Sequence, residues 1–288
     1  MSRVIGSPTQ VADWYLVREI GENIFWINEP AHVSFYIFRQ GHRALFIDSG
    51  LGLSNELGQS LLHHLGISEF VVYCTHTHCD HVGLNHMAKS VFLCRIEWEK
   101  YLRQNEVAQL QGYYSLLKDQ KKWPSGIVIN DSIRNWKPSS FILDGDAFEF
   151  GPWRFRTFEV PGHTSGSLAF FELNQNNLFL GDMVYSGTLY FHLTDSSFGQ
   201  YQCSLTRIKE LIDKSDRPIG LWPSHNQIPL DSDFLGDVKT TIRAINKGTI
   251  NHVRTWAKDA VFEEGVVYVD GLVKIVLRKD EYDGLQII

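Results

Sequence analysis

The amino-acid sequence predicts a layered α/β fold in which sheets are covered by helices. Two observations lead to this prediction. Short apolar runs bounded by turn residues recur along the chain, which is typical of buried strands. Longer segments with leucine at helical spacing lie between and after these runs, which is typical of helices packed on a sheet. Because 43% of the 288 residues are apolar and 13% are aromatic, the chain can fill a large core.

In the first half of the chain, apolar runs predict five strands. The third run stops at Ser49-Gly50-Leu51-Gly52. A helix is expected over 54–65, because Leu57, Leu61 and Leu65 share one face at helical spacing. The predicted strands span 24–28, 33–38, 43–48, 70–74 and 91–94.

The second half begins with a helical region at about 95–121, which ends near Pro124 and Gly126. Two paired strands are then expected to meet at Gly151-Pro152. A hairpin around Asp270-Gly271 is expected near the end of the chain. The predicted strands and hairpin span 141–150, 153–160, 167–173, 178–181, 219–222 and 265–278, and the predicted helices span 202–213 and 233–256.

Composition excludes several classes of protein. A net charge of −6 argues against a chain whose main task is to grip nucleic acid or an anionic membrane. No run approaches the length of a membrane helix, and the first residues lack the apolar core of a signal peptide. The four cysteines form no C-x-x-C pair, so they are expected to be free thiols in a reducing compartment. We therefore expect a cytoplasmic protein, folded as one domain over 1–288, that binds no nucleic acid and does not span a membrane.

A dense cluster of metal-binding side chains follows the predicted strand at 70–74. The segment Thr75-His76-Thr77-His78-Cys79-Asp80-His81 holds four imidazole or carboxylate groups in six positions. Such groups are the ligands that divalent transition metals favour in proteins. Without a metal, so many neighbouring titratable groups would repel one another and lose solvation, so the cluster predicts a metal site.

One cluster cannot close a metal site, and further candidates follow other predicted strands. His163 comes after the strand at 153–160, Asp182 after 178–181 and His225 after 219–222. A single His or Asp at the end of a strand is often only structural. All of these residues nevertheless lie where loops on a rigid sheet collect functional groups.

These residues together resemble the ligand series of the metallo-β-lactamase superfamily, and the resemblance covers about residues 24–226. The pattern is His76-x-His78-x-Asp80-His81 followed by His163, Asp182 and His225, and the turn at Asp48-Ser49-Gly50 resembles the early Asp-x-Gly motif of that family. The resemblance implies a four-layer αβ/βα sandwich with the metals at one edge of the sheets. It also implies two divalent metal ions, zinc first, with iron or manganese as alternatives.

Carried over by position, His76, His78 and His163 would bind one metal, and Asp80, His81 and His225 the other. Asp182 would bridge both. An Asp at the bridging position resembles the glyoxalase II, lactonase and thioesterase branches. The true β-lactamases usually carry Cys there, so antibiotic hydrolysis is disfavoured.

The resemblance implies a dinuclear hydrolase that attacks a thioester, ester or lactone carbonyl with a metal-bridging hydroxide. Asp80 is expected to handle the proton, and Tyr185 to donate a hydrogen bond to the oxyanion; packing is the alternative role of Tyr185. Asp48 is expected to orient a ligand imidazole, or only to form the turn.

The substrate is expected to be a small acyl ester, thioester or lactone, and a softer resemblance favours acyl-CoA thioesterases. A helical insert at about 95–125 carries aromatic residues that could line an acyl pocket near the active site, or serve only as core. Three alternatives remain open: a phosphodiesterase or nuclease, an iron-dependent oxidoreductase, and a non-catalytic binding protein. The oligomeric state is open as well, with a homodimer as one alternative.

Overall fold

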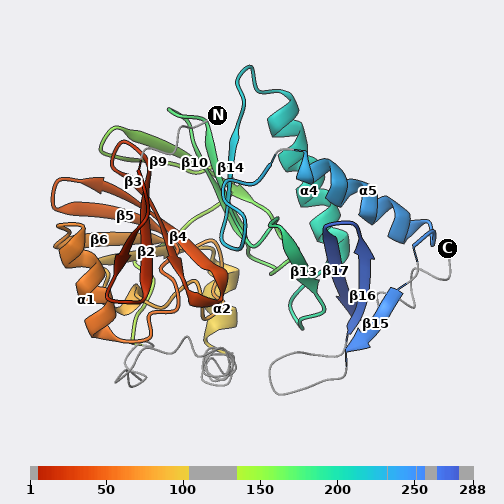
Figure 1. Cartoon of the computed structure of the whole chain (residues 1–288), viewed down its shortest axis with the longest axis horizontal. Coiled ribbons are helices and arrows are strands. Elements are labelled where there is room, and N and C mark those ends of the chain that lie inside the picture. The colour runs from red at the N-terminus through yellow and green to blue at the C-terminus, as the bar shows by residue number, and fades with distance from the viewer. Residues whose placement is uncertain (1–5, 104–134, 232, 251, 257–264, 279–288) are drawn as a thin grey trace. The chain divides into compact units, whose positions relative to one another are not determined.

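The computed structural model describes residues 6–103, 135–231, 233–250, 252–256 and 265–278 (Figure 1). The chain divides into two compact units, Met1–Phe155 and Arg156–Ile288. The single domain expected over 1–288 therefore stays a prediction. The helical insert expected at about 95–125 lies outside the described residues from 104 onward.

The first unit is built on an eight-stranded sheet whose strands follow one another in chain order. The strands from β1 to β5 pair antiparallel, and those from β5 to β8 pair parallel. The carboxyl ends of β5, β6 and β7 therefore meet at one edge, where functional groups collect in parallel sheets. The strands are β1 (Thr9–Val11), β2 (Tyr15–Gly21), β3 (Ile24–Glu29), β4 (Val33–Gln40), β5 (Arg43–Ile47), β6 (Glu69–Tyr73), β7 (Ser90–Leu93) and β8 (Ser140–Phe141).

Two helices pack on one face of this sheet. The helix α1 (Asn55–His64) begins at Ser54, whose side chain accepts a hydrogen bond from the backbone N–H of Leu57. Its leucines pack with Phe35 and Phe46 in one buried cluster, which also includes Tyr101 at the end of α2 (Arg95–Tyr101). Two single turns of 3-10 helix, η1 (Pro30–His32) and η2 (Asn85–Met87), complete the helical elements described in this unit.

The opposite face of the first sheet is covered by aromatic rings. Successive side chains of a strand point to opposite faces, so Phe38 lies on the other side from Phe35. The ring of Phe38 packs edge-on against Trp153 and Phe155, at centroid distances of 5.4 and 5.0 Å. Tyr73 stacks on Phe148 at 3.9 Å. The central strands are therefore buried on both faces, which explains their continuous apolar runs.

The remaining strands form two further sheets, with the orders β14-β12-β11-β10-β9 and β13-β17-β16-β15. The boundary between the units falls inside β10. The strands are β9 (Ala147–Phe150), β10 (Trp153–Glu159), β11 (Leu168–Glu172), β12 (Asn177–Gly181), β13 (Gly187–Phe191), β14 (Gly220–Pro223), β15 (His252–Trp256), β16 (Gly265–Asp270) and β17 (Val273–Arg278).

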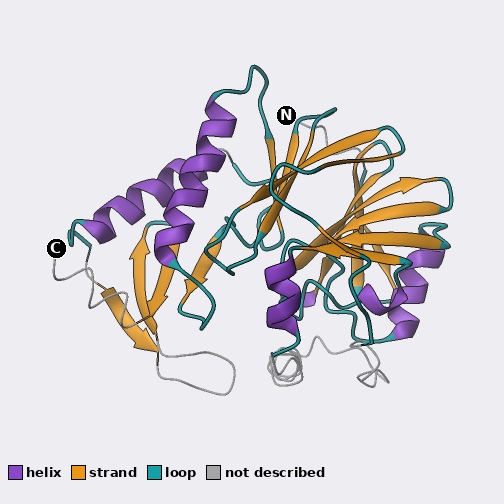
Figure 2. Ribbon diagram, turned by 180° about the vertical axis from the view of Figure 1, so that it is seen from behind, coloured by secondary structure: helices purple, strands orange, loops and turns teal. Residues whose placement is uncertain are grey.

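The second unit has its own core, formed by α4 (Phe198–Asp213), α5 (Phe234–Asn246) and the strands beside them. Figure 2 shows these two helices next to the β13-β17-β16-β15 sheet. Phe191 at the end of β13 packs against Tyr201 of α4 at a centroid distance of 4.2 Å. No helix of the described residues has both the length and the hydrophobicity that crossing a bilayer requires.

Most elements expected from the sequence are present, and the hairpin around Asp270-Gly271 is confirmed as β16 and β17. Two expectations were wrong. The strand at 141–150 is split, because Gly145 turns the chain with a positive φ of 80° between β8 and β9. The helix at 233–256 ends at Asn246, because Gly248 follows shortly after in the left-handed region (φ 64°), and residues 252–256 form β15 instead. The sequence analysis also missed β1, β2 and β13.

Candidate metal centre

In the first unit, Asp48 and the candidate ligands follow the carboxyl ends of two adjacent parallel strands. Asp48 comes directly after β5, and the segment 75–81 comes just after β6. Ile47 and Tyr73 are paired in the register of these strands, so the residues that follow them start side by side. The backbone N–H of Asp48 donates to the carbonyl of Tyr73 at 3.0 Å, which extends the ladder into the site.

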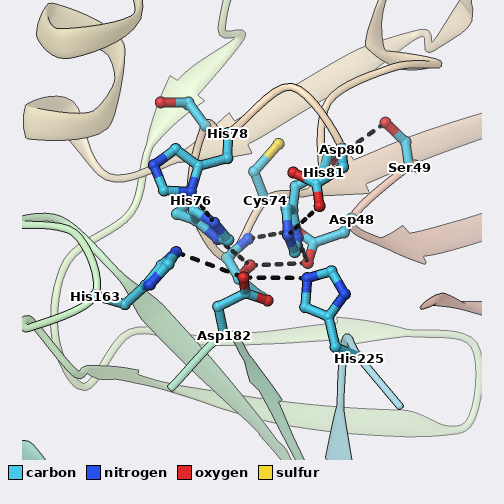
Figure 3. A network of polar contacts seen from close by, with 12 residues as sticks. Asp48, Ser49, Cys74, His76, His78, Asp80, His81, His163, Asp182 and His225 are labelled. Carbon is cyan, nitrogen blue, oxygen red and sulfur yellow. Dashed lines mark hydrogen bonds and ion pairs between the residues drawn. The ribbon is translucent and has the colours of Figure 1, made fainter. Parts of the chain in front are cut away.

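The buried carboxylate of Asp48 accepts three hydrogen bonds from the ligand segment (Figure 3). The backbone N–H of Thr75 donates to Oδ1 at 2.7 Å, and the Thr75 hydroxyl donates to Oδ2 at 2.8 Å. The Nδ1 of His81 donates to the same Oδ2 at 2.9 Å. Asp48 is therefore placed to orient a candidate ligand, which is one of the two roles considered for it.

These bonds determine which nitrogen of each imidazole is available to a metal. Because Nδ1 of His81 donates to a carboxylate, its lone pair lies on Nε2. The Thr75 hydroxyl has one proton, which it uses in the hydrogen bond to Asp48. Thr75 can therefore only accept a hydrogen bond from the Nδ1 of His76, 3.0 Å away. His76 therefore also presents the lone pair of Nε2. One carboxylate thus sets the tautomers of two candidate ligands, the first of them through a threonine.

The spacing of the nitrogens in His76-x-His78 suits a shared metal. The Nε2 of His76 lies 3.1 Å from the Nδ1 of His78, and the two rings are nearly perpendicular. Two nitrogens bound to one tetrahedral zinc at 2.0–2.1 Å lie about 3.3 Å apart. Asp80 and His81 offer a second pair, with Oδ2 and Nε2 3.7 Å apart. The residues of this unit therefore offer two pairs of donor atoms to a metal ion.

In the second unit, two candidate ligands lie beside a carboxylate oxygen of the third (Figure 3). His163 follows β10, Asp182 follows β12 and His225 follows β14. The Oδ2 of Asp182 lies 3.5 Å from the Nε2 of His163 and 3.1 Å from the Nε2 of His225. A carboxylate between two imidazoles has the geometry expected of a ligand that serves two metals.

A bound cation would stabilise this second group. The Nδ1 of His163 lies 3.3 Å from the carbonyl oxygen of Tyr190, which can only accept a hydrogen bond. A neutral His163 therefore turns the lone pair of its Nε2 toward the Asp182 carboxylate. Two electron-rich atoms facing each other in a largely buried position repel, and a shared divalent cation removes that repulsion. The chemistry of the donor set thus fits a metal.

A glycine places His163 against the helix that follows. Gly162 has a φ of 148°, and a Cβ at this position would lie 2.5 Å from the Cα of Tyr201 in α4. Its carbonyl accepts a hydrogen bond from the backbone N–H of Ser197, which begins α4, at 2.7 Å. Only glycine allows the loop to approach the helix so closely.

The hydroxyl of Tyr185 is engaged in a local hydrogen bond. It donates to the carbonyl of Thr188 at 2.6 Å, and its ring packs against the ring of His225 at 5.1 Å. A phenol has one proton, so donation to a substrate requires that the bond to Thr188 is given up. The side chain is buried beside a candidate ligand, as expected for either role considered for it.

The sequence analysis assigned no role to a buried glutamate that supports the loop after β5. Glu29, at the end of β3, accepts hydrogen bonds from the Nε1 of Trp14 at 2.8 Å and from the backbone N–H of Leu51 at 2.6 Å. Burial raises the pKa of Glu29 to about 7, although both hydrogen bonds oppose that shift. No local signal could have identified it, because its partners lie 15 and 22 residues away in the chain.

With fold and site described, the chain can be placed among known proteins. Residues 28–214 match the metallo-beta-lactamase superfamily, so the chain belongs to that superfamily. The resemblance stated from the residues alone is confirmed, and the chain is a metal-dependent hydrolase. The histidines and aspartates described above could hold its divalent metal.

Among curated proteins, the chain is similar to acyl-coenzyme A thioesterase MBLAC2. It is 26% identical to that protein of Gallus gallus over 219 residues, which cover 70% of this chain and 77% of the relative. It is also 29% identical to hydroxyacylglutathione hydrolase of Bdellovibrio bacteriovorus over 140 residues, covering 49% of this chain and 44% of the relative.

Among solved structures, the chain is similar to a metallo-beta-lactamase family protein from Thermus thermophilus. The TM-score is 0.56 and the identity 20%, with 78% of this chain and 81% of that chain covered. A metallo-beta-lactamase from Pontibacter korlensis gives a TM-score of 0.55 at 16% identity, with 80% and 99% covered. At these identities the likeness shows the fold alone, and it confirms the expected fold class.

Proposed function

We propose that this chain hydrolyses an acyl thioester, with esters and lactones as related substrates, by means of two divalent metal ions. The observation that carries the proposal is the orientation of the imidazoles in the segment 75–81. The hydrogen bonds of Asp48 and Thr75 leave the Nε2 lone pairs of His76 and His81 available to a metal. His78 lies beside the first of these nitrogens and Asp80 beside the second. The thioester is favoured because the thioesterase relatives match over most of the chain.

In the proposed centre, each unit supplies part of the ligand set. His76, His78 and His163 would hold one metal ion, Asp80, His81 and His225 would hold the other, and Asp182 would be shared between them. When bound, such metals lower the pKa of a water molecule toward neutrality and polarise a carbonyl. Zinc suits imidazole and carboxylate ligands, and iron and manganese accept the same set.

Three residues of the chain have proposed roles beside the metals. Asp80 holds the proton that leaves the attacking water and delivers it to the departing thiolate, which makes it the general acid and base. The hydroxyl of Tyr185 turns from the carbonyl of Thr188 to the developing oxyanion. Asp48 keeps His76 and His81 in place and does not touch the substrate.

The experiment combines metal analysis with a substrate panel. Tag-free protein is analysed by mass spectrometry for metals and assayed with an acyl-CoA, S-lactoylglutathione, an acyl-homoserine lactone and bis-p-nitrophenyl phosphate. We expect about two zinc ions per chain and the fastest turnover on a thioester. Asp182→Ala should abolish turnover, whereas Asp216→Ala, at an exposed position, should leave it unchanged.

Other outcomes of this experiment would contradict the proposed function. Undiminished activity of Asp182→Ala would overturn the proposed centre. Turnover of the phosphodiester alone would favour a phosphodiesterase. Iron without hydrolysis of any substrate would favour an oxidoreductase on the same fold. Failure to bind metal even after reconstitution would leave a non-catalytic binding protein as the better description.

A further inference from the structure

The helix α2 carries a fully buried glutamate that the proposed function does not use. Glu97 lies in the first turn of this helix, which follows the carboxyl end of β7, and its side chain has no exposed surface. Glu99, two residues further along the same helix, is exposed to solvent. Burying a carboxylate is costly unless it accepts good hydrogen bonds or meets a positive charge, so its partners indicate why it is there.

The partners of Glu97 lie inside the candidate ligand segment. The backbone N–H and the hydroxyl of Thr77 both lie 2.9 Å from its Oε2 and donate to it. The Nζ of Lys100, one turn further along α2, lies 3.6 Å from the same oxygen and offsets the buried charge. Thr77 is itself completely buried, so this contact is not shared with bulk water.

This arrangement repeats the contact that Asp48 makes from the other side of β6, since Asp48 follows β5 and Glu97 follows β7. Asp48 accepts from the N–H and the hydroxyl of Thr75, and Glu97 accepts from the N–H and the hydroxyl of Thr77. The two threonines flank His76, and Thr77 separates it from His78. The backbone that carries His76 and His78 is therefore hydrogen-bonded to a carboxylate at Thr75 and to another at Thr77.

Holding the Thr77 peptide controls the distance between the two imidazoles. The N–H that Glu97 accepts from belongs to the peptide that joins His76 to Thr77. A change in the backbone dihedral angles at Thr77 would move His78 relative to His76, and with it the nitrogens that now lie 3.1 Å from each other. Partners that orient metal ligands in this way typically change metal affinity by about 10-fold to 100-fold when they are removed.

We propose that Glu97 is a positioning residue of the metal centre, which holds the peptide of Thr77 and thereby keeps His76 and His78 at the spacing of a shared metal. The inference rests on the proposed function, because it requires that these histidines bind a metal. It adds a residue outside the ligand set, on a helix that follows a third parallel strand.

The test measures metal binding directly. Metal-free full-length protein is titrated with zinc against a chromophoric chelator, and the cobalt-substituted protein is examined by visible absorption. Glu97→Ala should raise the Kd of the first zinc by about 10-fold to 100-fold and shift the cobalt bands. Glu97→Gln, which keeps one acceptor oxygen, should recover part of the affinity. Glu99→Ala on the exposed face of α2 is the matched control and should behave as the unmodified protein.

A folding defect is separated from a positioning defect by a second variant. Thr77→Val keeps the shape of the side chain and the N–H but removes the hydroxyl, so we expect a smaller rise in Kd with an unchanged circular dichroism spectrum. If Glu97→Ala does not fold, Thr77→Val and Glu97→Gln decide the matter. Wild-type zinc affinity and cobalt bands in the folded variants would overturn this inference alone. Absence of zinc binding in the unmodified protein would overturn the proposed function as well.

Discussion

Asp48 has a backbone conformation that few residues with a side chain adopt. Its φ is 59°, in the left-handed region that glycine, asparagine and aspartate tolerate best. In this conformation the carboxylate is hydrogen-bonded to Thr75 and His81. Local backbone strain of this kind persists where the surrounding structure holds the residue in place. Here three hydrogen bonds to the carboxylate hold Asp48.

Tyr185 has two proposed roles, oxyanion donor and packing residue, that kinetics can separate. We expect Tyr185→Phe to lower kcat by about 10-fold with little change in KM, the low end of the loss of an oxyanion donor, because the hydroxyl must first leave the carbonyl of Thr188. Steady-state kinetics on the best thioester substrate measures both constants. An unchanged kcat together with a lower unfolding temperature would show that the hydroxyl only anchors the start of β13.

Glu29 should make stability depend on pH. Its folded-state pKa of about 7 lies above the usual value of 4.5, so the folded protein binds the proton more tightly than the unfolded chain does. The contribution is therefore fully present below pH 4.5 and is lost as the pH rises to about 7. The loss is at most about 3 kcal/mol, since each pKa unit corresponds to 1.36 kcal/mol.

Urea denaturation between pH 4.5 and 8 of the protein and of Glu29→Gln measures this term. Gln cannot ionise, so the difference in unfolding free energy between the two proteins should shrink with rising pH up to about 7 and then level off. Parallel pH profiles for the two proteins would show that Glu29 does not titrate in this range.

At the scale of elements, the loop after β5 and the loop after β6 are joined backbone to backbone. Ser49 N–H donates to the carbonyl of His81, and Gly83 N–H donates to the carbonyl of Gly50, each at 2.8 Å. Gly52 lies so close to Gly83 that a Cβ on either residue would meet the backbone of the other loop. Two glycines therefore allow the loop that carries Asp48 to lie against the loop that carries the ligands.

Gly52→Ala should destabilise the protein and weaken metal binding together. The added methyl group would press on the backbone of Gly83, and such overpacking costs about 1–3 kcal/mol on top of the strain of a positive φ. Gly41→Ala is the matched control, because Gly41 has a similar φ of 60° but open space around the added Cβ. It should cost only about 1 kcal/mol and leave zinc affinity unchanged. Thermal unfolding and zinc titration of both variants measure the two effects. Equal effects of the two substitutions would show that the close approach of Gly52 to Gly83 is not their cause.

At the scale of the whole molecule, the candidate ligands are divided between the two units. His76, His78, Asp80 and His81 belong to the first, and His163, Asp182 and His225 belong to the second. Each group places a carboxylate oxygen beside imidazole nitrogens in a largely buried position, where a shared cation would hold these donor atoms together. The proposed metals would therefore contribute to the stability of the folded chain as well as to its chemistry.

Removal of the metals should lower the unfolding temperature. A ligand that binds only the folded state adds about 2.7 kcal/mol of stability at a concentration 100 times its Kd. Differential scanning calorimetry of the chelated protein, and of the same protein after zinc is restored, measures the change. We expect zinc to restore the transition and magnesium at the same concentration to leave it low, because imidazole ligands favour zinc over magnesium. An identical transition with and without zinc would contradict a structural contribution of the metals.

The sequence alone determined much of the fold class and the whole set of candidate ligands. Buried strands such as β4 and β6 appear as apolar runs, and the cluster at 76–81 concentrates its groups within six positions. Both signals lie within a short window of the chain, which is the range over which periodicity and spacing can be read. The resemblance to the superfamily rests on the same local signals.

Only the tertiary structure decided how those ligands are held. Asp48 meets His81 across 33 residues, Glu97 meets Thr77 across 20, and Glu29 meets Leu51 across 22. These contacts exist because β3, β5, β6 and β7 end at particular places in one sheet, and strand order is a long-range property. A hydrogen bond between residues far apart in the chain leaves no local pattern, so the roles of Glu97 and Glu29 became visible only once the strands were placed, and Asp48 was expected only through the resemblance.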